Sequence, residues 1–457
     1  MSLPLTAFER YMLTDDCPEY PMTFTVRMKF SGRFDEAAFR RAVRRTVARH
    51  PLFASRVEGS KRHPQWVPTD EDVYLDIADL DTVLRFPGSE QIDLRKENGL
   101  RIWVRTGANW TEMRVQFQHC TTDGIGSYRF LEDLLCAYDA EACGREDVKA
   151  WRPIQPAKLA HRGDFGLRWW QVLLRLPLEI WGIIAGMVTF FFLKPTPLKT
   201  PLTPSETPAE RLVLLDYPTH TFSAAETQQI RQAGKREKAT LNDLMVRDLF
   251  VAMDAWNQQH SDGKSGRLMR VVTPVSLRSP GDEDLPATNV VAMVFLDRHL
   301  GLYRNARILL KSINWEMWYL RSWRLGIAFV RCTGLVSLFP GGLEFLTRSN
   351  RCYATATMSN MGQGLIETQL PRTEGKIIAG DLVLEALESA PPIRAFTSIG
   401  LTFVTYAGRL AMIMNYDRHH FTAATAQRLL KQYIAAIKSA AGIAEPATAD
   451  VDHVSVG

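Results

Sequence analysis

The alternation of apolar and polar residues predicts two strands in the first part of the chain. Residues 23–32, TFTVRMKFSG, and residues 113–118, MRVQFQ, each place an apolar residue at every second position, which is typical of a strand that buries one face. Between them, residues 33–50 have apolar side chains at helical spacing and four arginines on the opposite side, and Pro51 ends this predicted helix. After the Asp-Gly pair at 123–124, apolar residues return at helical spacing, so we expect strand, turn and helix in this order.

The second part of the chain repeats these patterns. It contains, in order, a predicted helix over 241–256, predicted strands over 269–278 and 410–417, and a predicted helix over 423–441. The two parts are joined by LKPTPLKTPLTPSETPAE, whose five prolines, at 195, 197, 201, 204 and 208, indicate an extended linker. The mixture of strands and helices predicts an α/β protein.

The length of the chain is sufficient for two or three folded units. It has 457 residues, of which 46% are hydrophobic and 23% charged, so large cores can form. From the patterns above we expect an N-terminal unit over 1–155, an apolar and basic insert with the linker over 156–210, and a C-terminal unit over 211–442. Residues 443–457 are expected to form a flexible tail.

Cysteine usage and the first residues indicate a cytoplasmic protein. The six cysteines are scattered and form no Cys-x-x-Cys pair, so we expect reduced thiols. The start, MSLPLTAFERYML, lacks the basic and apolar regions of a signal peptide. The net charge is only +5, and we expect no nucleic-acid partner. Residues 151–200 alone contain seven basic and two acidic residues, an excess equal to that of the whole chain.

A histidine and an aspartate stand at the predicted strand–turn junction. The stretch QFQHCTTDGIGSYRF, residues 116–130, places His119 at the end of the strand and Asp123 and Gly124 in the turn. An imidazole that projects from a strand end into a cleft can accept a proton near neutral pH and act as a general base. Asp123 could reach the imidazole or bind a basic residue, and Gly124 suits a positive φ or a close approach of another group. A surface turn with an incidental histidine is the alternative.

Other chemistry fits these residues less well. Cys120 follows His119 directly, and neighbours on a strand point to opposite faces, so the two cannot form a nucleophile–base pair. Gly124 and Gly126 disfavour the helix that a metal site shared by His119 and Asp123 would need, and we expect no metal. The glycine-rich loops that bind nucleotide phosphates are missing from the sequence.

Six segments resemble motifs of the CoA-dependent acyltransferase superfamily, which includes chloramphenicol acetyltransferase, peptide-synthetase condensation domains, plant BAHD enzymes and bacterial wax ester synthases. They are FDEAAFRRAVRRTVARHPLF (34–53), HCTTDG (119–124), ATLNDLMVRDL (239–249), TPVSLR (273–278), MSNMG (358–362) and LAMIMNYD (410–417). Residues 5–26 are also similar to the opening of wax ester synthases and alcohol acetyltransferases. The resemblance implies an α/β (α+β) fold of two chloramphenicol-acetyltransferase-like lobes. Each lobe would be a mixed sheet flanked by helices, with an active-site tunnel between them.

The resemblance also implies roles for the residues of the turn. His119 matches the family's catalytic base. Asp123 matches an acid that turns away from the substrate and pairs with an arginine of the other half, for which Arg278 is the match. Gly124 completes the motif. The sequence departs from the pattern at Gln118, where many members have a first histidine and others do not.

Five further residues are candidates for other parts of the site. Ser359 and Asn360 of MSNMG correspond to the floor of the tunnel and could donate hydrogen bonds to an oxyanion, with a capped turn as the alternative. The phosphates of CoA need cations, for which Lys235, Arg236 and Lys238 are candidates, although such a charge run is also typical of a solvated surface. The resemblance implies no bound cofactor and no metal, with acyl-CoA as co-substrate.

The implied reaction is direct transfer of an acyl group from acyl-CoA to a hydroxyl of a hydrophobic acceptor. His119 would deprotonate the acceptor as it attacks the thioester, and the CoA thiolate would take up the proton. A second hypothesis is a stand-alone condensation enzyme that uses a carrier-protein thioester and forms an amide or an ester. A third is a non-enzymatic interaction protein on a degenerate acyltransferase fold, to which Gln118 points.

Two segments rich in tryptophan and arginine indicate the kind of acceptor. Residues 165–193 include an apolar run over 180–193 that is shorter than the roughly 20 residues needed to span a bilayer. Residues 315–340 also combine tryptophans, arginines and apolar residues. Six of the eleven tryptophans lie in these two segments. A buried core helix is one interpretation, but the mixture is also typical of a headgroup interface. We therefore expect peripheral contact at the inner face of a membrane and a lipid-like acceptor.

Overall fold

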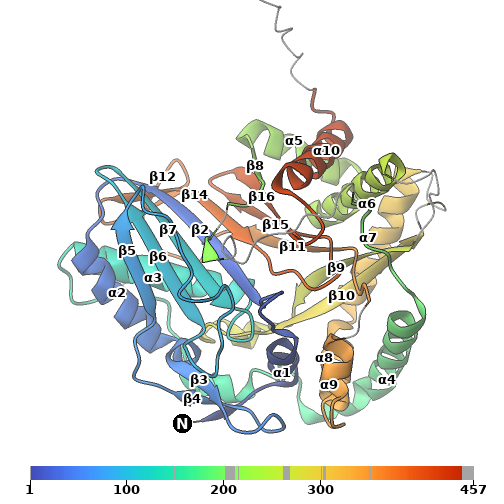
Figure 1. Cartoon of the computed structure of the whole chain (residues 1–457), viewed down its shortest axis with the longest axis horizontal. Helices are drawn as coiled ribbons and strands as arrows, with labels where there is room; N and C mark the ends of the chain where they lie inside the picture. The colour runs from blue at the N-terminus through green and yellow to red at the C-terminus, as the bar shows by residue number, and fades with distance from the viewer. Residues whose placement is uncertain are drawn as a thin grey trace, which may run out of the picture.

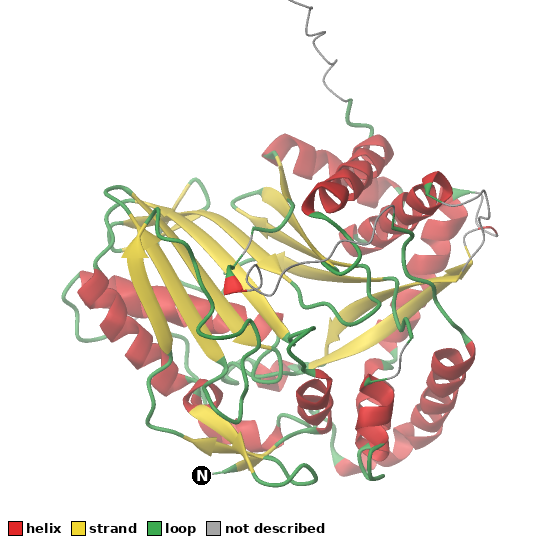
Figure 2. Cartoon of the chain, in the orientation of Figure 1, coloured by secondary structure: helices red, strands yellow, loops and turns green. Residues whose placement is uncertain are grey.

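Two mixed β-sheets, each flanked by helices, form the two lobes of the protein (Figures 1 and 2). The computed structural model describes residues 2–148, 150–200, 212–214, 216–260, 268–299, 301, 305–348 and 351–444. The expected α/β fold of two lobes is confirmed. The prolines at 201, 204 and 208 and the tail from residue 445 onward lie outside the described residues.

The N-terminal lobe is built on a seven-stranded sheet with the order β12-β13-β14-β2-β7-β6-β5. Its strands are β2 (Thr23–Ser31), β5 (Tyr74–Asp79), β6 (Leu100–Thr106), β7 (Trp110–Gln118), β12 (Arg372–Thr373), β13 (Lys376–Ala379) and β14 (Leu382–Ala390). Helices α2 (Glu36–Arg49) and α3 (Gly124–Ala142) cover one face of it. The sheet and helices share one core because the apolar side of each faces the other, as Val26, Val115, Phe39 and Leu134 show.

Three strands of this sheet come from the far end of the chain. β14 pairs antiparallel with β2, and β13 and β12 continue the sheet outward. These strands lie within 211–442, the range that we assigned from sequence to the C-terminal unit. The alternation of residues in a strand reports which face is buried but not which strand it pairs with, so the exchange could not be read from the pattern.

The C-terminal lobe contains a six-stranded sheet with the order β10-β9-β11-β15-β16-β8. Its strands are β8 (Thr219–Phe222), β9 (Leu268–Ser276), β10 (Val291–His299), β11 (Ala356–Gln363), β15 (Ile399–Tyr406) and β16 (Arg409–Tyr416). β11 runs parallel to both of its neighbours, while the other pairs are antiparallel. Helices α5 (Ala224–Arg236), α6 (Leu241–Gln259), α7 (Ala306–Ser322) and α10 (Ala423–Ala441) pack with this sheet.

The remaining helices gather at one end of the molecule, at the lower right of Figure 1. They are α1 (Ala7–Asp15), α4 (Trp169–Phe192), α8 (Gly326–Val336) and α9 (Gly342–Thr347). A small sheet of β1 (Leu3–Pro4), β3 (Ser55–Glu58) and β4 (Gln65–Pro68) lies beside them, and short 3-10 turns occur at Pro51–Ala54, Pro156–His161 and Pro280–Asp282. The segment 156–193, expected to be an apolar and basic insert, is therefore mainly a long helix.

The expected strand, turn and helix around residue 119 are present. β7 ends at Gln118, and α3 begins at Gly124 with Asp123 as its N-cap. The predicted helix over 33–50 corresponds to α2, and the predicted helices over 241–256 and 423–441 correspond to α6 and α10. The local patterns thus identified the elements that carry the candidate site.

Candidate active site

His119 is held at the junction of the two lobes. Its backbone N–H donates to the carbonyl of Met22, 2.7 Å away, and its carbonyl accepts a hydrogen bond of 2.7 Å from Nδ2 of Asn289 in the C-terminal lobe. The ring meets Phe24 edge to face, with 5.1 Å between the centroids. The backbone of His119 is therefore held from both lobes, and the imidazole lines a cavity of about 840 Å³.

The surroundings of His119 favour its neutral form. Burial lowers the pKa of the imidazole below its usual value, and a backbone hydrogen bond and the carboxylate of Asp123 offset this effect only in part. A neutral imidazole has one unprotonated nitrogen and can accept a proton at neutral pH. His119 thus presents a neutral imidazole to the cavity.

Asp123 is turned away from the cavity and into a set of hydrogen bonds. Its Oδ1 accepts from the backbone N–H of Gly126, and its Oδ2 accepts from the N–H of Val290, each at 2.8 Å. Arg278 donates to both oxygens, from Nη1 at 2.7 Å and Nη2 at 3.0 Å. Burial by itself would raise the pKa of Asp123, but Arg278 and the two backbone donors bring it below its usual value.

The pair formed by Asp123 and Arg278 joins the two lobes. Arg278 follows β9, and its Nη2 also donates to the carbonyl of Thr288 at 2.9 Å. Both side chains are more than nine-tenths buried. The structure therefore brings together the two residues that the resemblance pairs, and their contact fixes the loop that carries His119.

The glycine of the motif makes room for a methionine. A Cβ atom at Gly124 would lie 2.4 Å from Cε of Met361, and Gly124 is not among the residues with a positive φ. A glycine here could serve either a positive φ or the close approach of another group, and the structure shows the close approach. Ser359, on the same strand as Met361, donates to its sulfur at 3.7 Å, and Asn360 accepts from the N–H of Gly362 at 2.9 Å. Ser359 and Asn360 lie near the motif but do not line the cavity.

The candidate phosphate-binding residues lie elsewhere. Lys235 and Arg236 end α5, and Lys238 follows it; all three are exposed. Arg236 reaches the carbonyl of Ala441 at 3.5 Å, and the carbonyl of Lys238 accepts from Asn314 at 3.0 Å. The structure does not bring these three cations to the cavity that contains His119.

Gln118 and Cys120 have structural contacts. Oε1 of Gln118 accepts from the backbone N–H of Cys120 at 2.5 Å, and the thiol of Cys120 donates to the carbonyl of Glu9 at 3.2 Å. Burial raises the pKa of this thiol well above its usual value, so it is not an activated nucleophile. Cys120 belongs to a separate apolar core beneath the site, and it does not pair with His119.

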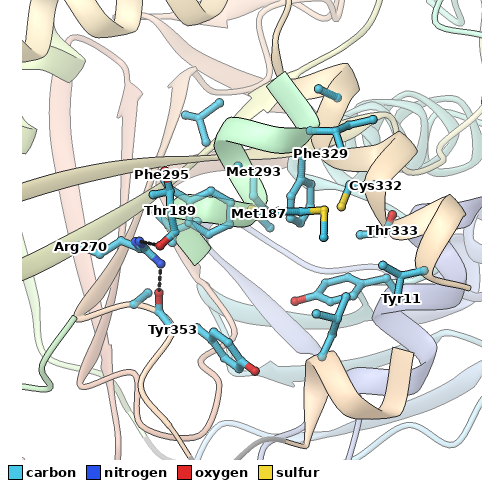
Figure 3. A pocket seen from close by; sticks show the side chains of 18 of the residues that line it. Tyr11, Met187, Thr189, Arg270, Met293, Phe295, Phe329, Cys332, Thr333 and Tyr353 are labelled. Carbon is cyan, nitrogen blue, oxygen red and sulfur yellow. Dashed lines mark hydrogen bonds between the residues drawn. The ribbon is translucent and has the colours of Figure 1, made fainter. Parts of the chain in front are cut away.

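The cavity is largely apolar and is lined by residues of both lobes. Figure 3 shows Met187, Met293, Phe329 and Cys332 around its centre, with Tyr11 and Tyr353 at one side. Arg270 donates from Nη2 to the carbonyl of Thr189 at 3.2 Å and from Nη1 to that of Tyr353 at 3.3 Å, and so ties α4 to the cavity wall. An apolar space of this size suits a substrate with a hydrocarbon chain.

Sequence reasoning missed a polar cluster in the cavity wall. Arg394 donates from Nη2 to Oδ1 of Asp15 at 2.7 Å, and its guanidinium stacks over the rings of Tyr11 and Tyr353. Burial raises the pKa of Asp15, and the positive charge of Arg394 opposes that rise. The partners are 379 residues apart, and no motif marks either of them.

Among the described residues, no group of three or more His, Cys, Asp or Glu side chains is arranged to hold a metal ion.

Sequence comparison finds a distant relative of the chain. No protein-family model matches the chain. An uncharacterized protein of Mycobacterium tuberculosis, Rv2305, is 26% identical over 290 residues, which are 61% of this chain and 62% of that protein. The chain thus aligns with less than two thirds of the length of this relative.

Solved structures match nearly the whole chain. The first condensation domain of the CDA synthetase has a TM-score of 0.66 and 13% identity, with 96% of each chain covered. The chain has the condensation-domain fold. The starter condensation domain of rhizomide synthetase, solved in complex with C8-CoA, has a TM-score of 0.64 and 12% identity over 97% of this chain and 95% of its own. The X-domain from teicoplanin biosynthesis has a TM-score of 0.64 and 16% identity over 96% of this chain and 95% of its own.

Proposed function

We propose that the protein is an acyltransferase that moves an acyl group from acyl-CoA to a hydroxyl of a hydrophobic acceptor. The observation that carries this proposal is the position of His119, a buried imidazole with a lowered pKa in the wall of an apolar cavity of about 840 Å³. A condensation-domain fold surrounds this histidine. The cavity accounts for a hydrophobic substrate, and the histidine accounts for proton transfer.

In the proposed reaction, His119 accepts the proton of the hydroxyl group of the acceptor. The oxygen of this hydroxyl group attacks the thioester carbonyl at the same time. The tetrahedral intermediate collapses, the carbon–sulfur bond breaks, and the thiolate leaves. The proton held by His119 then passes to the thiolate, which restores the neutral imidazole. The new ester bond and the free thiol balance the bonds that are broken. Asp123 and Arg278 touch neither substrate in this scheme, and they position the loop.

A carrier-protein thioester is the second candidate donor. The condensation-domain fold is common to the CDA synthetase domain and to the rhizomide domain that was solved with C8-CoA.

Gln118, which pointed to a non-enzymatic protein, has a structural contact with the backbone of Cys120 and so does not by itself favour that hypothesis. We place the reaction in the cytoplasm, which agrees with six cysteines that are all free.

The test is the release of free thiol from acyl-CoAs of graded chain length, with and without long-chain alcohols. Wild-type protein is expected to release thiol faster when an alcohol is present, and mass spectrometry should detect the ester. His161→Ala is the matched control, because this imidazole is exposed and pairs with Asp164, which is also exposed. Turnover with an acyl carrier protein but with no acyl-CoA would favour the second donor. No turnover with either donor would contradict the proposal.

A further inference from the structure

Helix α4 has an inverted distribution of polar and apolar side chains. Among its described side chains, the buried one is Glu179, which is 2% exposed. Trp169, Leu174 and Trp181 are 76%, 74% and 62% exposed. In a soluble protein a surface helix places its apolar side toward the core and its charges toward water. The apolar side of α4 instead faces outward.

Polar contacts hold this helix to the fold. Glu179 forms an ion pair with Arg331 of α8, and Arg175 donates to the carbonyl of Trp323 at 2.6 Å. Gly182 allows close packing, because a Cβ there would lie 3.1 Å from Cβ of Ala328. The side of α4 that faces the protein therefore uses charge and a small residue, and most of its large apolar side chains remain exposed.

The apolar composition of α4 is that of a membrane-associated helix. Residues 169–189 have a mean hydropathy of 1.6, and 6% of this window is buried. By length and composition it could cross a bilayer, and a core helix of the same composition would be mostly buried. The expected core-helix alternative for residues 165–193 is therefore wrong for this structure.

Both ends of α4 are tied to the same folded body. Before the helix, Arg162 pairs with Glu9 of α1 at 2.6 Å. After it, the N–H of Thr196 donates to the carbonyl of Leu268 at 3.1 Å. A helix that crossed a bilayer would place its ends on opposite sides of it, about 30 Å apart across the hydrocarbon. The structure therefore suits a helix that lies in the plane of the interface.

Exposed apolar side chains also occur on α7 and from α8 through α9, and some of them line the cavity. The further side chains that are more than half exposed here are Ile308, Trp315, Trp318, Leu335, Leu338, Phe339 and Phe345. Four of the exposed residues, Trp181, Trp315, Phe339 and Phe345, also line the cavity that contains His119. The cavity thus opens within this surface, which we call the apolar face.

Exposed cations accompany the apolar face. Arg168 is the N-cap residue of α4, Lys194 follows its last turn, and Arg321 lies in the last turn of α7 beside Trp318. Cations around a tryptophan-rich apolar surface complement a leaflet with anionic headgroups, whose phosphates they can contact while the apolar residues enter the hydrocarbon. A lipid leaflet fits this combination better than another protein surface, because basic residues border exposed tryptophans and the cavity opens among them.

We propose that α4, with the exposed parts of α7, α8 and α9, docks into one leaflet of an anionic lipid bilayer, and that the cavity opens into its hydrocarbon region. A hydrophobic substrate then reaches His119 from the leaflet without crossing water. The docking stands apart from the reaction, whereas this route for the substrate rests on the proposed acyltransferase function.

Flotation of the full chain with vesicles tests the docking. The vesicles contain phosphatidylcholine with and without phosphatidylglycerol. The variant Leu174→Gln/Ile184→Gln/Val188→Gln changes exposed positions of α4 that do not line the cavity. We expect it to bind vesicles at least about tenfold more weakly than wild type. The matched control, Leu80→Gln/Val83→Gln, changes exposed apolar residues of the N-terminal lobe and is expected to bind as wild type does.

Charge variants test the choice of lipid. Arg168→Glu/Lys194→Glu/Arg321→Glu should reduce the preference for anionic vesicles, and reversal of the exposed arginines Arg33, Arg40 and Arg44 should not. His119→Ala should bind vesicles fully, so loss of catalysis and loss of docking remain separable. The proposal is overturned if wild type ignores vesicles, or if the triple α4 variant binds undiminished. It is also overturned if sedimentation shows a dimer that the triple α4 variant dissociates, because a second copy would then cover the apolar face.

Discussion

Arg278 and Asp123, 155 residues apart in the sequence, meet through a two-pronged ion pair of 2.7 and 3.0 Å that spans the two lobes. The carboxylate also caps α3 and accepts from the backbone of Val290. The same side chain thus ends the loop of His119, starts a helix and holds the second lobe. Loss of either partner leaves the other charge buried without an opposite charge beside it.

The first prediction concerns the stability of this pair. Asp123→Ala and Arg278→Ala should each lower the free energy of unfolding by about 3–5 kcal/mol, and the double variant should cost clearly less than the sum. Urea unfolding of the four proteins measures the coupling. Arg278→Lys is the control that keeps the charge and loses the planar fork, and it should be intermediate. Additive losses would contradict an energetic role for the contact.

The second prediction concerns the catalytic base. His119→Ala should lower kcat by about 10²-fold or more with little change in unfolding, because the general-base contribution is lost. The assay is thiol release with a long-chain alcohol, next to the exposed control His161→Ala. Retention of wild-type kcat in the His119 variant would remove this residue from the mechanism.

The third prediction concerns pH. Burial lowers the pKa of His119, so the neutral form persists below the usual imidazole pKa of about 6.5. The kcat/KM profile should therefore stay flat as the pH falls through that value and decline only at lower pH. The same sign holds for stability, since protonation of a histidine buried in its neutral form opposes folding at acid pH. An acid limb above the usual imidazole value would show that the charged form is favoured instead.

The local elements around His119 could be predicted from sequence, because each depends on neighbours along the chain. Alternation identified β7, helical spacing identified α3, and the Asp-Gly pair identified the turn between them. The contact of Asp123 with Arg278 required the family resemblance, since no local pattern specifies a partner 155 residues away. Physical reasoning from the residues alone left two outcomes open for the aspartate.

Other features could not be predicted because they depend on tertiary packing. The pairing of β14 with β2 brings residues near 385 into the first lobe, and the ion pair of Asp15 with Arg394 joins residues 379 positions apart. The exposed side of α4 is another case. Its apolar run predicts that the helix packs against apolar groups of the protein or of a membrane. Only the structure shows that the described residues leave this side of α4 exposed.

The fourth prediction concerns the length of the acyl chain. Cys332 lies on α8 in the wall of the cavity, near Phe329 and Met187 (Figure 3). Cys332→Trp places a large ring in the space that the proposed function assigns to a hydrocarbon chain. We expect kcat/KM to fall by about tenfold or more for long acyl-CoAs and to stay within about twofold for the shortest ones, because a filled cavity excludes bulk and leaves the reacting carbonyl accessible.

Two controls keep this result specific. Cys143→Trp changes an exposed cysteine at the end of α3 that does not line the cavity, and it should leave the chain-length profile unchanged. Urea unfolding of Cys332→Trp separates a narrowed cavity from a damaged fold, because overpacking of a filled core would instead lower stability by about 1–3 kcal/mol. An equal loss for short and long acyl-CoAs, in a protein that unfolds like wild type, would contradict the assignment of this cavity to the acyl chain. The long chain would then have to bind outside the space lined by α4 and α8.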